Sequence, residues 1–202
     1  MLRTRLTTGL LLLPLLLNGC GADTADPQSA TTPQQPNAPV TEALLDRYPI
    51  TDTSAGAIQL GMLSTDIPAA MPGANAAVEQ DGDGIEWMTL KMNGEALMNI
   101  MLDRSTHTAN LIRILSPRFI TAQGVKVGEN LQSVGEKLGG LKEIQWTEIE
   151  SREFATFNNA PVTMVFQVIA NNGMAGIYPS GETITTVAAS SATIHSIWLM
   201  QD

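Results

Sequence analysis

The 202-residue sequence has few aromatic side chains, few positive charges and a single cysteine. Aromatic residues make up 4% of the chain, so a packed core must rely on Ile, Val, Leu, Ala and Met within a hydrophobic fraction of 44%. A single cysteine cannot form a disulfide within the chain or a metal site built from several thiolates. These absences exclude a disulfide-stabilised scaffold.

Positive charge is scarce, because 11 Lys and Arg stand against 20 Asp and Glu and give a formal net charge of −9. Loss of the first 19 residues removes Arg3 and Arg5 and makes the charge more negative still. Such a surface repels phosphate backbones, which argues against nucleic acid as a partner. The alternative is that this charge only keeps the protein soluble.

The first twenty residues have the layout of a bacterial lipoprotein signal. Arg3 and Arg5 supply a positive start, residues 10–17 form an apolar run, and the segment ends in Leu17-Asn18-Gly19-Cys20. The run is too short to cross a bilayer, which takes about 20 residues. Signals of this kind are cleaved before the cysteine, whose thiol receives a diacylglyceryl group. We expect residues 1–19 to be a signal peptide and Cys20 to be lipidated.

Lipidation predicts where the protein resides. Two or three acyl chains anchor firmly, whereas one chain anchors only marginally. Gly21 occupies the position at which Asp usually marks retention in the inner membrane, so we expect the outer membrane, with the protein facing the periplasm. Residues 20–49 then form the lipidated cysteine, a flexible tether rich in Pro, Ala, Thr and Gln, and a short helix at 41–47.

Residues 50–202 are expected to form a single α+β domain, mainly antiparallel β-sheet with two or three short helices. Asn93-Gly94 is a strong hairpin signal between strands at 85–92 and 97–102. Further strands are expected at 110–115, 142–149, 154–157, 163–170 and 192–200. Residues 173–191 form a long connection of small polar residues, and connections of that length usually have a role or are mobile.

A weak internal repeat has an offset of 67 positions. Residues 58–61 precede Ile67, Met71 and Gly73, while residues 125–128 precede Val134, Leu138 and Gly140. Each copy has the pattern of a strand, a glycine turn and a short helix closed by glycine. Duplication of one unit and a coincidence of local patterns both remain open.

Four short motifs occur in an order that resembles the RpoE-regulated lipoproteins of Gram-negative bacteria. They are Ile112-Arg113-Ile114-Leu115-Ser116, Gly124-Val125-Lys126-Val127-Gly128, Pro179-Ser180 with Thr183-Ile184, and Ile194-His195-Ser196-Ile197-Trp198. The resemblance covers residues 110–198 and the lipoprotein signal. It implies an uncharacterised outer-membrane lipoprotein expressed under envelope stress, and it supplies no catalytic residue or ligand. Family members can carry cysteines in the region of residues 139–153, where this chain has none.

Catalytic and metal-binding patterns fail in detail. Asp81-Gly82-Asp83-Gly84 does not fit the calcium-loop template, which places a ligand where Met92 stands, so a tight turn is expected. His107 and His195 lack zinc-site spacing, and no Gly-x-Ser-x-Gly elbow occurs. Residues 124–128 lack the Gly-Lys-Ser/Thr ending of a phosphate loop.

Three acidic residues, Glu148, Glu150 and Glu153, are expected at the wet edge of a hairpin. Paired carboxylates can also perform acid–base chemistry, but sequence alone does not place them in a cleft. We therefore assign no catalytic, cofactor-binding or metal-binding residue, and expect no cofactor.

Four of the ten methionines, Met88, Met92, Met98 and Met101, cluster on one expected hairpin. Methionine adapts to irregular shapes and is used at permissive binding surfaces, so these residues predict a surface for a ligand or partner. The alternative is that they fill an aromatic-poor core.

The leading hypothesis is therefore a non-enzymatic, lipid-anchored envelope protein that contacts another envelope protein or a cell-wall component. The alternative is a periplasmic binding module for a lipid or a cell-wall-derived ligand.

Overall fold

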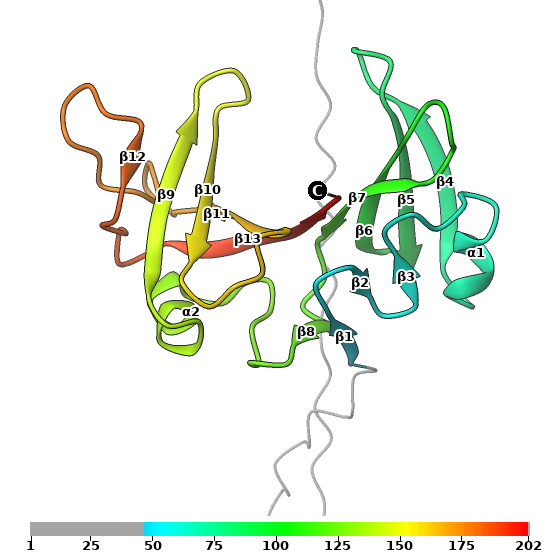
Figure 1. Ribbon diagram of the computed structural model, residues 1–202, viewed down its shortest axis with the longest axis horizontal. Helices are drawn as coiled ribbons and strands as arrows, with labels where there is room; N and C mark the ends of the chain where they lie inside the picture. Colours follow the sequence, from blue (N-terminus) through cyan, green and yellow to red (C-terminus); the bar gives the residue numbers. More distant parts are fainter. Residues whose placement is uncertain (1–46, 202) are drawn as a thin grey trace, which may run out of the picture. The chain divides into compact units, whose positions relative to one another are not determined.

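The computed structural model describes residues 47–201, which form two β-sheets and two helices (Figure 1). The helices are α1 (Ile67–Ala70) and α2 (Leu131–Lys137). The expected signal peptide, Cys20, the tether and all but the last residue of the expected helix at 41–47 lie outside the described residues. Between residues 47 and 201, neither helix has the length and apolar composition that a membrane crossing needs.

The larger sheet has nine strands, and every neighbouring pair in it is antiparallel. Its order is β12-β9-β10-β11-β13-β7-β6-β5-β4. The strands are β4 (Asn75–Gln80), β5 (Glu86–Met92), β6 (Glu95–Leu102), β7 (Ala109–Ile114), β9 (Leu141–Thr147), β10 (Arg152–Phe157), β11 (Met164–Ile169), β12 (Ile184–Thr185) and β13 (Thr193–Met200).

The smaller sheet has the order β3-β2-β1-β8. Its strands are β1 (Tyr48–Ile50), β2 (Ser54–Ala55), β3 (Ile58–Gln59) and β8 (Phe119–Thr121). β1 and β8 pair in parallel, and the rings of Tyr48 and Phe119 stack with their centroids 5.1 Å apart. The buried hydrophobic residues of this sheet and of both helices belong to the same cluster as the hydrophobic residues on one face of the larger sheet.

Local sequence explains the main turns and the start of each helix. Asn93 and Gly94 both have positive φ, 52° and 84°, as a two-residue hairpin turn requires, and they join β5 to β6. Pro68 lies in the first turn of α1, where a missing N–H is tolerated. Asn130 caps α2 by accepting a hydrogen bond from the Gln132 amide at 2.9 Å.

The mainly antiparallel β-sheet expected from the sequence is confirmed, and the described residues contain two helices. Five strands were not expected from the sequence: β1, β2, β4, β8 and β12. All six residues of β4 are exposed because it is an edge strand, so it lacks the alternation of buried and exposed residues that marks a half-buried strand.

The strand expected at 125–128 is wrong. Val125 is fully buried, but the segment pairs with no strand and connects β8 to α2 as a loop. Val125 is hydrogen-bonded to Thr121, whose amide donates to the Val125 carbonyl at 3.0 Å and whose hydroxyl accepts from the Val125 amide at 3.1 Å. At the other end of the segment, the Gly128 amide donates to the Ile194 carbonyl at 2.8 Å.

The sequence repeat is matched by a repeat of elements. α1 is followed by the antiparallel strands β4, β5, β6 and β7, and α2 is followed by β9, β10, β11 and β13, with β12 inserted before the last. Buried Ile67 of α1 and buried Val134 of α2 are 67 positions apart, as are Trp87 of β5 and Phe154 of β10. The two halves meet at the β7–β13 pair, near the centre of the larger sheet (Figure 1).

Candidate functional site

The larger sheet has one buried face and one open face. On β6 and β7 the side chains of Met98, Ile100, Ile112 and Ile114 belong to the hydrophobic core. Because side chains alternate along a strand, Asn99 and Arg113 project from the opposite face. We call this opposite side the open face.

Polar side chains on neighbouring strands lie opposite one another and form a row across the open face. Asn99 is opposite both Thr89 and Arg113, and its amide donates to the Thr89 hydroxyl at 2.8 Å. On the other side of Arg113, the Trp198 indole N–H donates to the Ser196 hydroxyl at 2.7 Å, and Ser196 donates to the Gln167 carbonyl oxygen at 2.9 Å.

At the middle of the open face, two arginines cover one tryptophan. Arg113 on β7 is directly opposite Trp198 on β13, and its guanidinium carbon lies 5.4 Å from the centroid of the indole ring. The guanidinium carbon of Arg152, from β10, lies 5.8 Å from the same ring. The Phe154 ring contacts Trp198 edge-on at 5.1 Å. Trp198 is therefore only 7% exposed.

The two guanidinium groups create a local positive charge in an acidic protein. Burial is the main cause that lowers the pKa of Arg113, and the charge of Arg152 lowers it further. The buried Nε of Arg113 has no hydrogen-bond partner, and among residues 47–201 Arg113 makes no ion pair. Arg152 pairs with the exposed Glu150 at 3.2 Å, and such exposed pairs contribute little stability.

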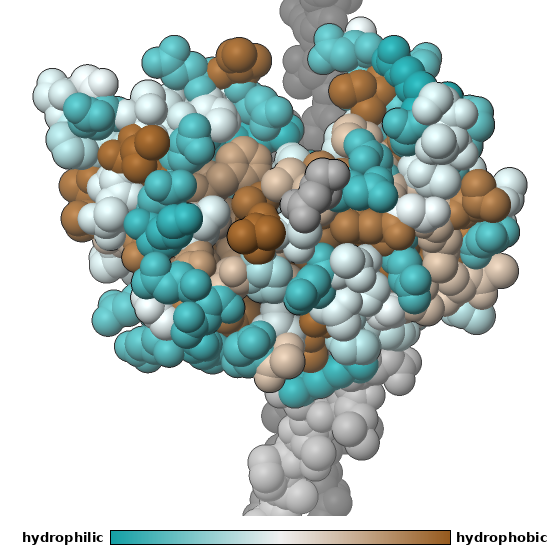
Figure 2. Space-filling model, in the orientation of Figure 1, coloured by the Kyte–Doolittle hydropathy of each residue, from teal (hydrophilic) through white to brown (hydrophobic). Residues whose placement is uncertain are grey.

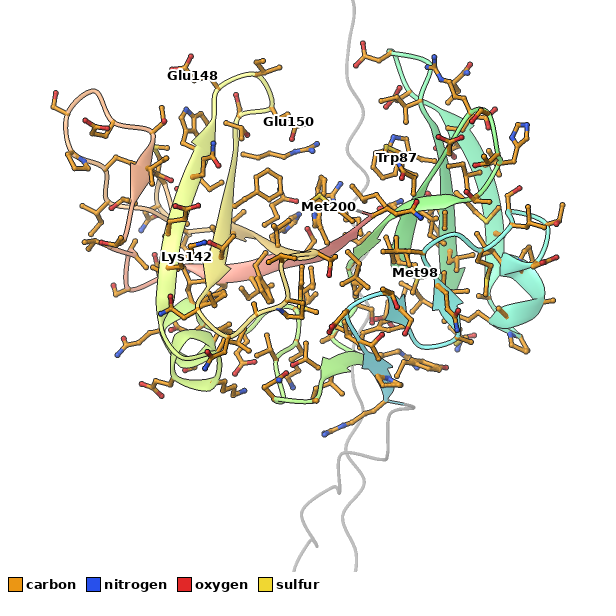
Figure 3. All side chains as sticks on the ribbon, viewed as in Figure 1. Trp87, Met98, Lys142, Glu148, Glu150 and Met200 are labelled. Atoms are coloured by element: carbon orange, nitrogen blue, oxygen red, sulfur yellow. The ribbon has the colours of Figure 1, made fainter. Side chains whose placement is uncertain are left out.

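A pocket of about 530 Å³ lies over these arginines, between the β4–β5 turn and the β9–β10 turn. Its lining comes from β4, β5, β6, β7 and the β9–β10 hairpin. Figure 3 shows Trp87 and Glu150 on the two hairpins that flank the pocket. The volume is in the range typical of small-ligand sites.

The β4–β5 turn supplies an acidic rim to the pocket. Asp81 closes the tight turn that the sequence predicted: its Oδ1 accepts from the amides of Asp83 and Ile85, and its Oδ2 accepts from the Trp87 indole at 3.0 Å. The hydrogen bond from the Ile85 amide is the main cause that lowers the pKa of Asp81. Hydrophilic residues gather over this turn at the upper right of Figure 2. Within residues 47–201, no group of three His, Cys, Asp or Glu side chains is arranged to hold a metal ion.

His195 is exposed at a β-bulge of β13, where Gln167 pairs with Ser196 and Val168 pairs with Ile194. Burial of part of the ring lowers the pKa of His195 below 6.5, and the charges of Arg113 and Arg152 lower it further. His107 is exposed in the β6–β7 turn, so the structure does not bring the two histidines together.

The depressed pKa of His195 predicts a pH effect on stability. The His195 imidazole binds a proton near pH 6.5 in the unfolded chain and only at lower pH in the folded chain. The contribution of neutral His195 to the free energy of unfolding is therefore fully present above pH 6.5. It is lost as the pH falls through the folded pKa. We expect urea denaturation to show that His195→Gln loses less stability than the wild type between pH 7 and 5. Identical pH dependence of the two proteins would contradict this assignment.

Glu153 corrects one expectation from the sequence. It is not at a wet edge, because it is 6% exposed and accepts hydrogen bonds from the amides of Ala175 and Gly176 at 2.6 and 2.7 Å and from the Tyr178 hydroxyl at 2.9 Å. Burial and this carboxylate raise the pKa of Tyr178 above its usual range. Glu148 and Glu150 are exposed in the β9–β10 turn.

The same contacts order the start of the long connection at 173–191. Beyond them, the connection contains β12, which pairs with β9, and a bridge between Gly176 and Ala188. The segment is therefore built onto the sheet by its backbone, with the buried Glu153 carboxylate as its attachment point.

The four methionines do not form one surface. Met88 and Met98 are 4% and 0% exposed and lie in the core, which corrects their assignment to a binding surface. Side chains alternate between the two faces along β5 and β6, and the pairing register places Met88 and Met98 on the buried face. Met92 and Met101 are partly buried, and a binding role for them stays a prediction.

Sequence reasoning did not find the Arg113–Arg152–Trp198 cluster. Arg113 was visible only as a charged residue alternating with apolar neighbours on an expected strand, a signal that usually marks a solvated face. Arg152 and Trp198 are distant from it in sequence, and the order of strands in the sheet brings the three together.

The fold is similar to that of the uncharacterized protein yfeY from Escherichia coli. The similarity has a TM-score of 0.54 and covers 77% of this chain and 99% of that protein's chain. The two sequences are 12% identical, so the likeness concerns the fold alone. No protein-family model and no curated protein sequence matches this chain.

Proposed function

We propose that this protein is a non-enzymatic, lipid-anchored lipoprotein of the outer membrane that binds a component of the cell envelope through the open face of its larger sheet. The proposal includes membership of the RpoE-regulated lipoprotein family. The lipoprotein signal ending at Cys20 supports the anchor, and the order of the four sequence motifs supports the family. The fold shared with almost the whole chain of yfeY is consistent with a common family of proteins.

The motifs that carry the family resemblance fall on the candidate site. Residues 112–116 include the end of β7, and residues 194–198 lie within β13. These are the two strands that place Arg113 beside Trp198. The resemblance therefore includes the centre of the open face, and this coincidence is an argument for binding at that face.

The single observation that carries the binding role is the pocket of about 530 Å³ over two clustered arginines. Arg113 makes no ion pair within residues 47–201, and its positive charge at the pocket of a protein with net charge −9 is suited to an anionic group of a ligand. In the described part of the chain, no histidine ring hydrogen-bonds to a serine or a carboxylate, so the site offers no nucleophile–base pair.

The anchor is tested by replacing Cys20 with Ser. Without the thiol no diacylglyceryl group can be attached, and we expect most of the protein to move from the outer-membrane fraction to the soluble periplasmic fraction. Fractionation of cells followed by immunoblotting measures this change. The Lys142→Gln variant, which alters an exposed residue on β9, serves as the control and should remain in the membrane fraction.

The anchoring proposal fails if Cys20→Ser sediments with outer membranes as the wild type does. It fails equally if mass spectrometry of the native protein shows an unmodified cysteine or an intact signal peptide. Crosslinking in cells addresses the partner separately: recovery of no envelope component above background would count against an interaction role.

A second candidate function is binding of an apolar ligand. A cleft of about 620 Å³ lies between α2, residues 139–141 that follow it, and residues 186–190 of the connection that leads to β13. Its surface is more apolar than that of the arginine pocket, which favours a lipid-like occupant. None of the four clustered methionines lines it. Displacement of a fluorescent fatty acid, lost in a Gly135→Leu variant, would support this alternative.

A further inference from the structure

We propose that the pocket on the open face binds a short zwitterionic peptide, with the carboxylate of the peptide held by Arg113 and Arg152 and its ammonium group held at the acidic β4–β5 rim. The inference rests on the proposed binding function and names the class of ligand. It follows from the separation of opposite charges across one pocket.

The positive side of the pocket suits a carboxylate. Arg113 and Arg152 come from different halves of the sheet and lie over the same indole ring, at 5.4 and 5.8 Å. Arginine presents planar pairs of N–H donors that match the two oxygens of a carboxylate. Arg113 lines the pocket and makes no ion pair within residues 47–201, so the terminal N–H groups of its guanidinium remain available to a ligand. Arg152 is paired with Glu150, which also lines the pocket, so a bound carboxylate would take the remaining donors of Arg152 and would relieve the repulsion that the two guanidinium groups exert on each other.

The negative side of the pocket suits an ammonium group. Glu79 is opposite Trp87 in the β4–β5 register, so its side chain shares the open face, and Asp83 follows in the turn. Both residues are exposed and line the pocket. Arg104 donates to the carbonyl of Asp83 rather than to its carboxylate, at 2.9 Å. The rim therefore carries net negative charge opposite the arginines.

This arrangement discriminates between classes of anion. A polyphosphate or a phosphorylated sugar would gain from the arginines but would be repelled by Glu79, Asp81 and Asp83. A molecule with one negative and one positive end satisfies both sides. Trp87 also lines the pocket and is partly exposed. Its ring adds an apolar surface against which small side chains of a peptide can pack.

The proposal is tested by titrating the mature full-length protein, in detergent, with tri-alanine and following tryptophan fluorescence and heat. Hydrogen bonds to charged groups contribute about 1.5–3 kcal/mol, so Arg113→Gln or Arg152→Gln should weaken binding by about tenfold or more. Glu79→Gln should weaken it by about threefold, since the rim is exposed. Lys142→Gln, an equal charge change away from the pocket, should leave the affinity unchanged.

Peptides with one end blocked show which side of the pocket holds the carboxylate and which holds the ammonium group. Tri-alanine amide lacks the carboxylate and should bind about tenfold more weakly to the wild type, but equally to wild type and Arg113→Gln. N-acetyl tri-alanine lacks the ammonium group and should be insensitive to Glu79→Gln. Because Glu79 is exposed, its variant is expected to fold and keeps the test valid if the Arg113 variant is unstable.

The source of the peptide is distinguished by co-sedimentation with purified cell-wall sacculi. Sedimentation that tri-alanine competes away indicates stem peptides of the wall, whereas binding of tri-alanine without sedimentation indicates free peptides. The proposal is overturned if tri-alanine does not bind at millimolar concentration, if its amide binds equally well, or if inorganic pyrophosphate binds more tightly. Failure of peptide binding leaves the anchor intact, since Cys20→Ser is read by fractionation.

Discussion

Glu153→Ala is expected to reduce the free energy of unfolding by about 3 kcal/mol, because each buried N–H left without a partner costs about 1–3 kcal/mol. The substitution removes the acceptor for the amides of Ala175 and Gly176 and for the Tyr178 hydroxyl. Domains of this size have total stabilities of about 5–15 kcal/mol, so the loss is large. Urea denaturation measures it.

Hydrogen exchange gives a second readout for the same change. The amides of Ala175 and Gly176 should lose protection in Glu153→Ala beyond the global loss of stability, because the start of the 173–191 segment is attached through them. Glu148→Ala is the matched control, since Glu148 is exposed in the β9–β10 turn and its loss should change stability by less than about 0.5 kcal/mol. If both variants unfold at the same urea concentration, the carboxylate of Glu153 does not hold this segment.

Trp198→Ala is expected to reduce the free energy of unfolding by about 3–5 kcal/mol, the usual cost of removing a large buried aromatic side chain. The ring is 7% exposed, packs edge-on against Phe154 and donates from its indole N–H to Ser196. Its removal also takes away the surface that Arg113 and Arg152 cover. Urea denaturation followed by circular dichroism measures the stability.

Two conservative variants separate the contributions. Trp198→Phe keeps most of the packing and loses the hydrogen bond to Ser196, so we expect a smaller loss of about 1–2 kcal/mol. Trp87→Phe, on the more exposed β5 side of the pocket, loses only the hydrogen bond to Asp81 and should cost less than about 1 kcal/mol. A loss below about 1 kcal/mol in Trp198→Ala would show that the tryptophan is not a structural part of the open face.

Local sequence was enough to predict the β5–β6 and β10–β11 hairpins and seven of the nine strands of the larger sheet. Asn93-Gly94 specifies a turn with positive φ at both residues, and alternation of apolar and polar residues at 110–115 and 142–149 places strands there. β4 escaped because an exposed edge strand needs no alternation, and the segment at 125–128 misled because a buried apolar residue can belong to a loop.

Buried polar residues were the hardest to predict. Three glutamates stand close together in the sequence, at positions 148, 150 and 153. Only Glu153 is buried, because the segment at 173–178 folds over it. The faces of the methionines were equally hard to predict. Met88 and Met98 belong to the core, while Met101 shares the face of Trp87, and the strand register alone decides which face each side chain takes.

By itself, the sequence determined the acidic net charge, which follows from composition alone. It also determined the expected lipid attachment at Cys20, the turns and the alternation that divides each strand into two faces, because these depend on residues close together in the chain. Only the tertiary structure decided where charge gathers. β7, β10 and β13 carry Arg113, Arg152 and Trp198 from positions far apart in sequence. Antiparallel pairing across two similar halves brings the three residues together beside the pocket that the two arginines line. Sites formed by strand order are set by long-range pairing, which local patterns do not encode.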